Sequence, residues 1–365
     1  MEALTARDHK QPLSIQKVDI PEPGADDVII KVVAAGLTPG VVKMVNAGRS
    51  HLPTTVGHEA AGVVSAVGSN VTNVATGDRV RLHPVLSCRN CQLCLQGQDQ
   101  MCDSAAIMGF ASFSPKKELY EKYHDGTVAE FVRAPSWLVD HLPTDVSFET
   151  GAKLHDLATA ARAIKLARLP DNATIVLTAP TGAMGALSLR VAEKFGIGKI
   201  VLVGRSKERM DMVRQFATVP TEIYHVSNED SGNQNVVKEL VALAPEGIDA
   251  IIDYLPSGNL ISKLLPAMSS GGVLVHYGGN PNLIQVPLVA VMAKCWTIIG
   301  ARAHTREDAK ECLQWLSSGE VAIDDLITHR FKASEVDKML QLMDSRDEHM
   351  LLTVLNIEFS APAVV

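Results

Sequence analysis

Four of the six cysteines of this 365-residue chain lie within one short segment, at Cys88, Cys91, Cys94 and Cys102. Two-residue gaps on a tight loop allow neighbouring thiolates to turn toward one ion, and zinc prefers four such ligands in a tetrahedron at about 2.3 Å. Because four protein ligands leave no open position, this spacing predicts a structural zinc site. A group of free or disulfide-bonded thiols is the alternative, which a reducing compartment disfavours.

Composition narrows the classes of partner. The chain is 46% hydrophobic and 21% charged, with a net charge of -7 and a pI near 5.9. An acidic surface argues against nucleic acid or an anionic membrane as the main partner, and a small molecule is expected instead. No apolar run reaches the length of about eighteen residues that a membrane span needs. Because Met1 to Lys10 lacks an apolar signal-peptide core, a cytoplasmic location is expected.

The sequence pattern changes along the chain in a way that predicts two domains. Between Ile15 and Val80, short β-branched runs alternate with Pro and Gly, which favours a β-barrel-like region. From Lys153 onward, short apolar strands alternate with helical stretches such as Ala186–Phe195 and Lys207–Phe216. This alternation predicts a parallel doubly wound sheet in an α/β fold. Its expected strands are Ile175–Leu177, Ile200–Val203, Ala250–Asp253, Val273–His276 and Thr297–Ile299.

Three further segments carry simpler expectations. Arg306–Leu316 has the pattern of a helix, and Leu351–Ile357 returns to the composition of a strand. The charged stretch Pro115–Asp125 is expected to be a solvated loop, and the alternative is that it lies over the mouth of a cleft, where loops often carry function.

A glycine turn after the first strand of the expected sheet predicts a dinucleotide site. The strand Ile175–Leu177 is followed by Ala179-Pro180-Thr181-Gly182-Ala183-Met184-Gly185 and then by a helix. Gly182 would let the backbone approach a pyrophosphate at the helix N-terminus, and Gly185 would let helix and strand pack closely. Ala179 stands where the fingerprint has its first glycine. A plain tight turn is the alternative interpretation, although the strand before and the helix after favour the cofactor.

The end of the next strand favours NADP(H) over NAD(H). It reads Val203-Gly204-Arg205-Ser206-Lys207, without the acidic residue that would bind the ribose hydroxyls of NAD. Arg205, with Lys207 or Arg209, could instead pair with a 2'-phosphate. The alternative is that these are ordinary solvated charges at the start of a helix.

These motifs together resemble the zinc-type medium-chain dehydrogenase/reductase superfamily, the alcohol dehydrogenase-like proteins, along essentially the whole chain. The resemblance rests on the glycine turn, the cysteine segment and four short motifs: Gly57-His58-Glu59, Gly77-Asp78-Arg79-Val80, Gly126-Thr-Val-Ala-Glu-Phe and Gly271-Gly-Val-Leu-Val-His-Tyr-Gly.

The resemblance implies a particular organisation. A GroES-like catalytic domain would comprise residues 1–152 and 301–365, with the structural zinc lobe at about 88–102, and a Rossmann domain would comprise residues 153–300. It also implies a substrate cleft where the domains join, and a homodimer in which Thr297–Gly300 is the outer strand that pairs across the interface.

The chain departs from the family at its second, catalytic zinc. The resemblance implies a cysteine ligand at Thr38 and a proton-relay hydroxyl at Gly40, and both are lost. His58 and Glu59 remain, while His155 stands where the family most often has cysteine. A neutral hydroxyl is a poor zinc ligand, so replacing a thiolate by Thr38 should weaken the site strongly. An atypical zinc site of His58, Glu59 and His155 remains conceivable.

Without a metal, the same residues suit acid/base chemistry. His58 and His155 would titrate near neutrality, and Glu59 or Asp156 could orient an imidazole and raise its proton affinity. The alternative is that both histidines are held in packing hydrogen bonds. His51, His83 and His276 are expected to be structural or surface histidines.

Three functions follow. The first is an NADPH-dependent reductase acting on the C=C or C=O bond of a small hydrophobic metabolite without a standard catalytic zinc. The second is a double-bond isomerase that uses the His, Glu and Asp side chains to shift a proton without redox chemistry. The third is a non-catalytic relative, which the retained titratable groups disfavour. A zinc-dependent alcohol dehydrogenase with the atypical His58, Glu59 and His155 site is a further alternative.

Overall fold

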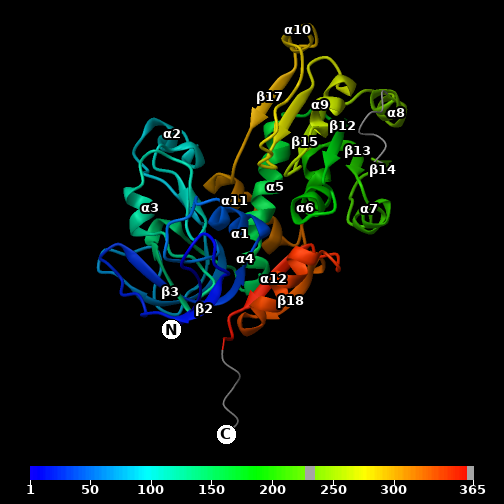
Figure 1. Cartoon of the computed structure of the whole chain (residues 1–365). Helices are drawn as coiled ribbons and strands as arrows, with labels where there is room; N and C mark the ends of the chain where they lie inside the picture. The colour runs from blue at the N-terminus through cyan, green and yellow to red at the C-terminus, as the bar shows by residue number, and fades with distance from the viewer. Residues whose placement is uncertain (227–234, 360–365) are drawn as a thin grey trace. The chain divides into compact units, whose positions relative to one another are not determined.

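The computed structural model describes residues 1–226 and 235–359. The chain divides into two compact units, Met1–His155 with Ala303–Val365, and Asp156–Arg302. The first unit thus contains both ends of the chain (Figure 1).

A seven-stranded sheet forms the centre of the first unit. Its strands follow the order β11-β6-β5-β3-β19-β18, and β10 also pairs with β3. The C-terminal strand β19 pairs with β3, so the end of the chain completes a sheet begun near its start. The strands are β3 (Asp27–Gly36), β5 (Glu59–Val67), β6 (Arg79–Leu82), β10 (Phe131–Pro135), β11 (Val139–His141), β18 (Ile327–Lys332) and β19 (Leu352–Asn356).

Two smaller sheets and several helices complete this unit. One small sheet has the order β2-β1-β4 and the other the order β7-β8-β9. Their strands are β1 (Glu2–Ala6), β2 (Ser14–Lys17), β4 (Thr54–Thr55), β7 (Val85–Leu86), β8 (Ala106–Ile107) and β9 (Ala111–Ser112). The helices are α1 (Pro39–Asn46), α2 (Gln92–Leu95), α3 (Glu118–Lys122), α4 (Phe148–Ala152), α11 (Arg306–Ser318) and α12 (Val336–Ser345).

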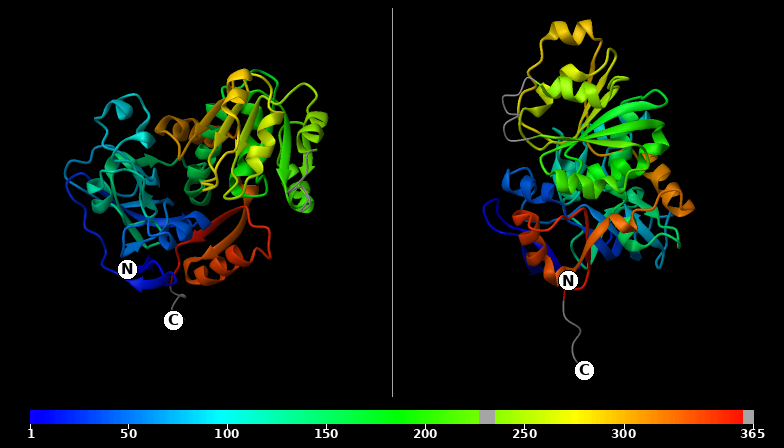
Figure 2. Two further views of the ribbon diagram at one scale, coloured as in Figure 1. Left: turned by 45° about the horizontal axis from the view of Figure 1, so that its top comes forward. Right: turned by 90° about the vertical axis from the view of Figure 1, so that its right-hand side faces the viewer.

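The second unit contains one six-stranded parallel sheet of order β14-β13-β12-β15-β16-β17 (Figure 2). In chain order these strands read 3-2-1-4-5-6, which is the Rossmann arrangement and confirms the predicted fold class. The strands are β12 (Ala173–Thr178), β13 (Ile197–Gly204), β14 (Thr221–His225), β15 (Ala250–Asp253), β16 (Val273–His276) and β17 (Thr297–Gly300). The helices are α6 (Ala183–Val191), α7 (Lys207–Arg214), α8 (Val236–Leu243), α9 (Leu260–Leu264) and α10 (Leu288–Ala293), while α5 (Leu154–Leu166) begins in the first unit.

The central strands of this sheet could be predicted from the sequence because they are completely buried. Every residue of β12 is buried, as is every residue of β15. A parallel strand covered on both faces is continuously apolar, so the strand appears as an uninterrupted run. β14, with only Tyr224 buried, lies at the edge of the sheet and was not predicted.

The prediction that Pro115–Asp125 forms a solvated loop was wrong in part. Residues Glu118–Lys122 form the short helix α3, and the rings of Tyr120 and Tyr123 are buried. The Tyr123 hydroxyl donates to Asp27 Oδ1 at 2.6 Å. The charged residues of this segment are therefore interspersed with two aromatic residues of the core.

Among the described residues, no helix is both long and apolar enough to cross a membrane.

Candidate functional site

The four cysteines come together as a metal-binding group. One ligand atom from each lies within 4.8 Å of all the others, and among the described residues this is the one such group of three or more His, Cys, Asp or Glu side chains. The Sγ atoms of Cys91 and Cys94 are 3.5 Å apart, and α2 begins directly after Cys91. Backbone N–H groups of Cys88 and Ser104 point at the Cys102 sulfur. Four thiols with backbone donors fit a structural zinc ion.

Glu59 lies at the start of β5 and forms a buried ion pair. Its Oε2 atom is 2.6 Å from Nζ of Lys153, and the exposed fractions of the two side chains are 0% and 2%. Gly36 pairs with Glu59 across the sheet, and a Cβ atom at Gly36 would lie 1.7 Å from the same carboxylate oxygen. The carboxylate therefore fits only because residue 36 is glycine.

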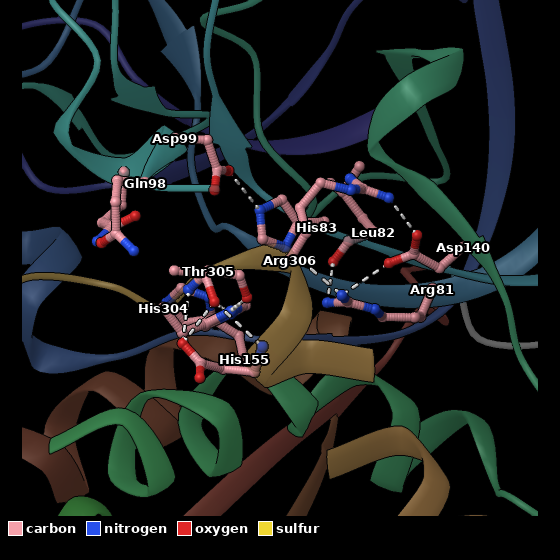
Figure 3. A network of polar contacts seen from close by, with 12 residues as sticks. Arg81, Leu82, His83, Gln98, Asp99, Asp140, His155, His304, Thr305 and Arg306 are labelled. Carbon is pink, nitrogen blue, oxygen red and sulfur yellow. Dashed lines mark hydrogen bonds and ion pairs between the residues drawn. The ribbon is translucent and has the colours of Figure 1, made fainter. Parts of the chain in front are cut away.

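A directed hydrogen-bond chain orients His155 (Figure 3). Nδ1 of His304 lies 2.9 Å from the Thr305 carbonyl oxygen, which can only accept, so this nitrogen carries the proton. In a neutral His304, Nε2 is then the acceptor, and it lies 3.0 Å from Nδ1 of His155. Hence Nδ1–H of His155 donates, and Nε2 of His155 is left as the proton-accepting nitrogen.

Burial keeps these imidazoles neutral. Burial, together with the nearby charge of Arg81, lowers the pKa of His304 to about 4. Burial, reinforced by His304 and His58, lowers the pKa of His155 well below its ordinary value. The pKa of His83, whose ring is 5.0 Å from that of His304, is lowered well below the usual range for the same reason. The sequence led us to expect Glu59 or Asp156 to orient an imidazole and raise its pKa; His304 orients His155 instead, and burial lowers the pKa.

Arg81 supplies a fixed positive charge next to this chain. It is fully buried and donates to Asp140 Oδ2 at 2.7 Å, and Arg306 bonds the other carboxylate oxygen at 2.5 Å (Figure 3). Although burial opposes it, the two guanidinium groups hold the pKa of Asp140 below its ordinary value. Two positive charges on one carboxylate leave a net positive field, which disfavours a protonated His304.

His58 and Thr38 share an aromatic neighbour. The ring of His58 is 5.0 Å from that of His155 and 5.1 Å from that of Phe110. A Cβ atom on Gly40 would lie 3.3 Å from Phe110 and 3.5 Å from Thr38 Oγ1. The first unit therefore gathers Thr38, His58, Glu59 and His155 in one region. Asp156, buried in the first turn of α5, falls in the second unit.

The residues at the expected second zinc do not fit a standard three-ligand site. His58, Glu59 and His155 are not among the described groups whose ligand atoms approach within 4.8 Å. The Glu59 carboxylate already bonds an ammonium group, and a threonine hydroxyl is a weak ligand. The two imidazoles can act on protons.

The glycine turn of the second unit fits a dinucleotide. Gly182 is the N-cap of α6, and the nearest atom to a Cβ built there is 3.9 Å away. The protein itself therefore does not require glycine at this position, whereas a phosphate approaching the helix N-terminus would. At Gly185 a Cβ would lie 2.4 Å from the Pro180 carbonyl oxygen, so close packing requires glycine. Ala179 takes a positive φ of 46°, which fits the first glycine of the fingerprint.

The other predicted cofactor residues surround this turn. Thr181, Ala183 and Met184 lie in the turn and at the start of α6, and Gly204 ends β13. Arg205 is exposed, Ser206 caps α7, and Lys207 pairs with Asp211 at 2.8 Å. The ammonium group of Lys207 thus forms an ion pair within its own helix, whereas the exposed Arg205 precedes the helix.

Two residues of the site were missed in the sequence, Lys153 and His304. Lys153 is the one charge in the otherwise small and apolar run Gly151–Leu154, and such an isolated lysine before a buried helix was a usable signal. His304 lies far from His155 in the chain, and no spacing rule connects them.

Comparison with known proteins gives two family matches. Residues 24–144 match the alcohol dehydrogenase GroES-like domain, and residues 183–318 match the zinc-binding dehydrogenase domain. The chain is 31% identical to L-idonate 5-dehydrogenase of Vitis vinifera, covering 89% of this chain and 86% of the relative. It is 29% identical to sorbitol dehydrogenase of Arabidopsis thaliana, covering 88% and 86%.

Solved structures show the same fold. A short chain alcohol dehydrogenase (rspB) of E. coli CFT073 in complex with NADH superposes with a TM-score of 0.84 at 22% identity, covering 98% of this chain and 99% of that one. A protein described as a zinc-binding dehydrogenase, from Sinorhizobium meliloti 1021 and bound to NADP, gives a TM-score of 0.78 at 20% identity, covering 98% and 99%.

Proposed function

Since the chain belongs to the zinc-type medium-chain dehydrogenase/reductase superfamily and is an oxidoreductase of that family, we propose that it is an NADP(H)-dependent enzyme acting without a standard catalytic zinc. Its reaction is hydride transfer to or from the C=O or C=C bond of a small metabolite, with a histidine moving the proton.

The orientation of His155 carries the proposal. His304 accepts a hydrogen bond from Nδ1–H of His155, which leaves Nε2 of His155 as a defined proton acceptor beside His58. A general base needs such a fixed tautomer and a neutral resting state. The lowered pKa of His155 supplies that neutral state.

Each residue then has a role. A dinucleotide held at the glycine turn between β12 and α6 would supply or accept the hydride. Nε2 of His155 takes a proton from a substrate hydroxyl during oxidation and returns it during reduction. The charge of Arg81 disfavours passing that proton on to His304, so His304 acts as a positioning residue. His58, 5.0 Å from His155, is the second group that can carry the proton.

The substrate side favours an apolar group. The rings of Phe110 and Phe113 lie 6.0 Å apart, and Phe110 contacts the His58 region. The names of the two relatives above refer to idonate and sorbitol, which are rich in hydroxyl groups. Aromatic side chains next to the histidines support a more hydrophobic substrate for this chain.

NADP(H) is supported by the charge at the end of β13. Arg205 follows Gly204 and is exposed, and no carboxylate stands where NAD-selective enzymes place one. Arg205→Ala should weaken NADPH binding by about 1.5–3 kcal/mol, the range of a hydrogen bond to a charged group, and leave NADH binding nearly unchanged. Equal losses for both cofactors would point to a general effect on the fold.

A turnover experiment tests the reaction. The purified protein is incubated with NADPH and a panel of small ketones, aldehydes and enones, while cofactor oxidation and product mass are followed. A product two mass units heavier with equivalent NADPH loss supports hydride transfer. An isomerised product of unchanged mass, formed without NADPH loss, would contradict it. His155→Ala and His58→Ala should each reduce turnover. Full activity in both variants would show that neither histidine transfers the proton.

A homodimer through β17 is also proposed. This strand is the outer edge of the six-stranded sheet, and Ile298 on it is 43% exposed. The helix α10 precedes β17 in the chain and lies beyond one end of the strand (Figure 1). Its side chains Leu288, Val289 and Met292 are apolar and exposed. An apolar edge strand left open invites pairing with another chain, and a second copy would cover it.

A further inference from the structure

Glu59, one of the three residues expected at a second zinc site, forms a buried pair with Lys153. Glu59 follows His58 directly in the chain, and Lys153 precedes His155 by two residues. Nζ of Lys153 is 2.6 Å from Oε2 of Glu59, and neither side chain reaches solvent to more than 2%. A positive charge therefore already lies on the carboxylate of Glu59, one of the three residues expected to bind the metal.

This pair is built into the sheet. Gly36 lies opposite Glu59 in the β3–β5 register, and only the absence of its side chain leaves space for the carboxylate. Thr127 Oγ1 donates to the Glu59 carbonyl oxygen at 3.0 Å and so fixes the backbone there. A buried lysine is tolerated when a carboxylate and further polar contacts compensate its charge. The carboxylate position and its ammonium partner thus depend on each other.

The ammonium changes what the donors can bind. A divalent ion at this site needs Glu59 as its anionic ligand. The Glu59 carboxylate is already paired with the Lys153 ammonium group, whose positive charge repels a second cation close by. With Thr38 in place of a thiolate, His58 and His155 would be left as two neutral ligands, too few for a stable zinc site.

We propose that the Lys153 ammonium is the resident cation of this centre, that it keeps a divalent metal from His58, Glu59 and His155, and that removing its charge converts the site into a zinc site. The inference rests on the proposed function only for the claim that this region is the catalytic centre. Without Lys153, the carboxylate is free to turn toward the two imidazoles, which gives a two-histidine, one-glutamate ligand set of the kind catalytic zinc sites use.

Metal stoichiometry tests the proposal without any substrate. The wild-type protein and Lys153→Met are purified, supplied with excess zinc, freed of loose metal and measured for zinc per chain. We expect one zinc ion in the wild type, held by the cysteine quartet, and two in Lys153→Met. Cobalt in place of zinc gives a visible absorption spectrum, in which nitrogen and oxygen ligands are distinguished from thiolates. Two zinc ions in the wild type, or one in both proteins, would overturn the proposal.

Two controls separate metal binding from folding. Lys153→Met leaves the buried Glu59 uncompensated, so the variant is expected to be less stable. Its melting temperature should then rise by about 3–4 °C when zinc exceeds its dissociation constant a hundredfold, while that of the wild type should not change. The double variant Lys153→Met with Glu59→Gln restores neutrality and removes the ligand. It should fold and bind one zinc ion, and a second ion there would count against the proposal.

The proposed function can fail independently. If the wild type holds one zinc and Lys153→Met holds two, the inference stands even when no NADPH-dependent turnover is found. If turnover is found but the variant binds no additional metal, the function stands and Lys153 is not the group that excludes the metal.

Discussion

Nε2 of His304 lies 3.0 Å from Nδ1 of His155, and the two rings come from segments 149 positions apart in the chain. Because the Thr305 carbonyl fixes the proton on the far side of His304, the direction of this hydrogen bond is determined. The position of one backbone carbonyl therefore decides which nitrogen of His155 can take a proton.

Replacing His304 tests the hydrogen-bond chain from the Thr305 carbonyl through His304 to His155. His304→Phe keeps an aromatic ring but cannot accept the hydrogen bond from Nδ1–H of His155, so the imidazole of His155 can rotate or change tautomer. Loss of the hydrogen bond that orients a metal-bound histidine typically reduces activity 10- to 100-fold, and the same orienting role is removed here. We expect kcat/KM to fall by about that factor and its pH profile to shift. His304→Gln offers an acceptor oxygen and should recover part of the loss. An unchanged pH profile in His304→Phe would show a packing role only.

The buried histidines also make stability depend on pH. The pKa values of His83, His155 and His304 are all lowered in the folded chain, so the unfolded chain binds more protons below its ordinary histidine pKa of about 6.5. Their contribution is complete above that pH and is lost as pH falls toward the folded value, about 4 for His304.

Denaturant unfolding between pH 7.5 and 5.5 measures this effect. The free energy of unfolding should decrease as pH falls below about 6.5, and the decrease should be smaller in His304→Gln, which lacks one of the three groups. Zinc content is measured in each sample, so that metal loss from the cysteines is not mistaken for histidine protonation. If the free energy of unfolding falls equally with pH in the two proteins, protonation of His304 does not contribute to the effect.

The parts predicted from sequence share a physical origin. The parallel sheet, the glycine turn and the cysteine quartet are encoded by local spacing or by continuous burial, which a sequence displays directly. The His155–His304 bond and the Arg81–Asp140–Arg306 group join segments brought together only by the fold. Glu59 was recognised from its motif, whereas Lys153 was missed, because an isolated lysine in an apolar run suggests burial but does not identify the carboxylate with which it pairs.

The two glycines of the cofactor turn should respond differently to alanine. At Gly182 an added Cβ has no protein atom closer than 3.9 Å, so Gly182→Ala should fold normally and lose cofactor affinity where a phosphate would approach. At Gly185 the Cβ would meet the Pro180 backbone at 2.4 to 2.6 Å, so Gly185→Ala should lower the free energy of unfolding by about 1–3 kcal/mol.

Thermal unfolding and NADPH titration of both variants check this contrast. Loss of stability without loss of binding in Gly182→Ala would contradict the proposed position of the phosphate.

A charge on the outer strand tests the dimer. Ile298→Lys places an ammonium on the exposed edge of β17, where natural sheets use lysine to prevent pairing. We expect the wild type to sediment as a dimer and Ile298→Lys as a monomer with an unchanged circular dichroism spectrum. Met212→Lys is the matched control, since Met212 lies on α7 of the same unit with a similar exposed fraction, 46% against 43%. Dissociation in both variants would indicate a general effect of charge. A dimer that survives Ile298→Lys would show that the subunits meet through another surface.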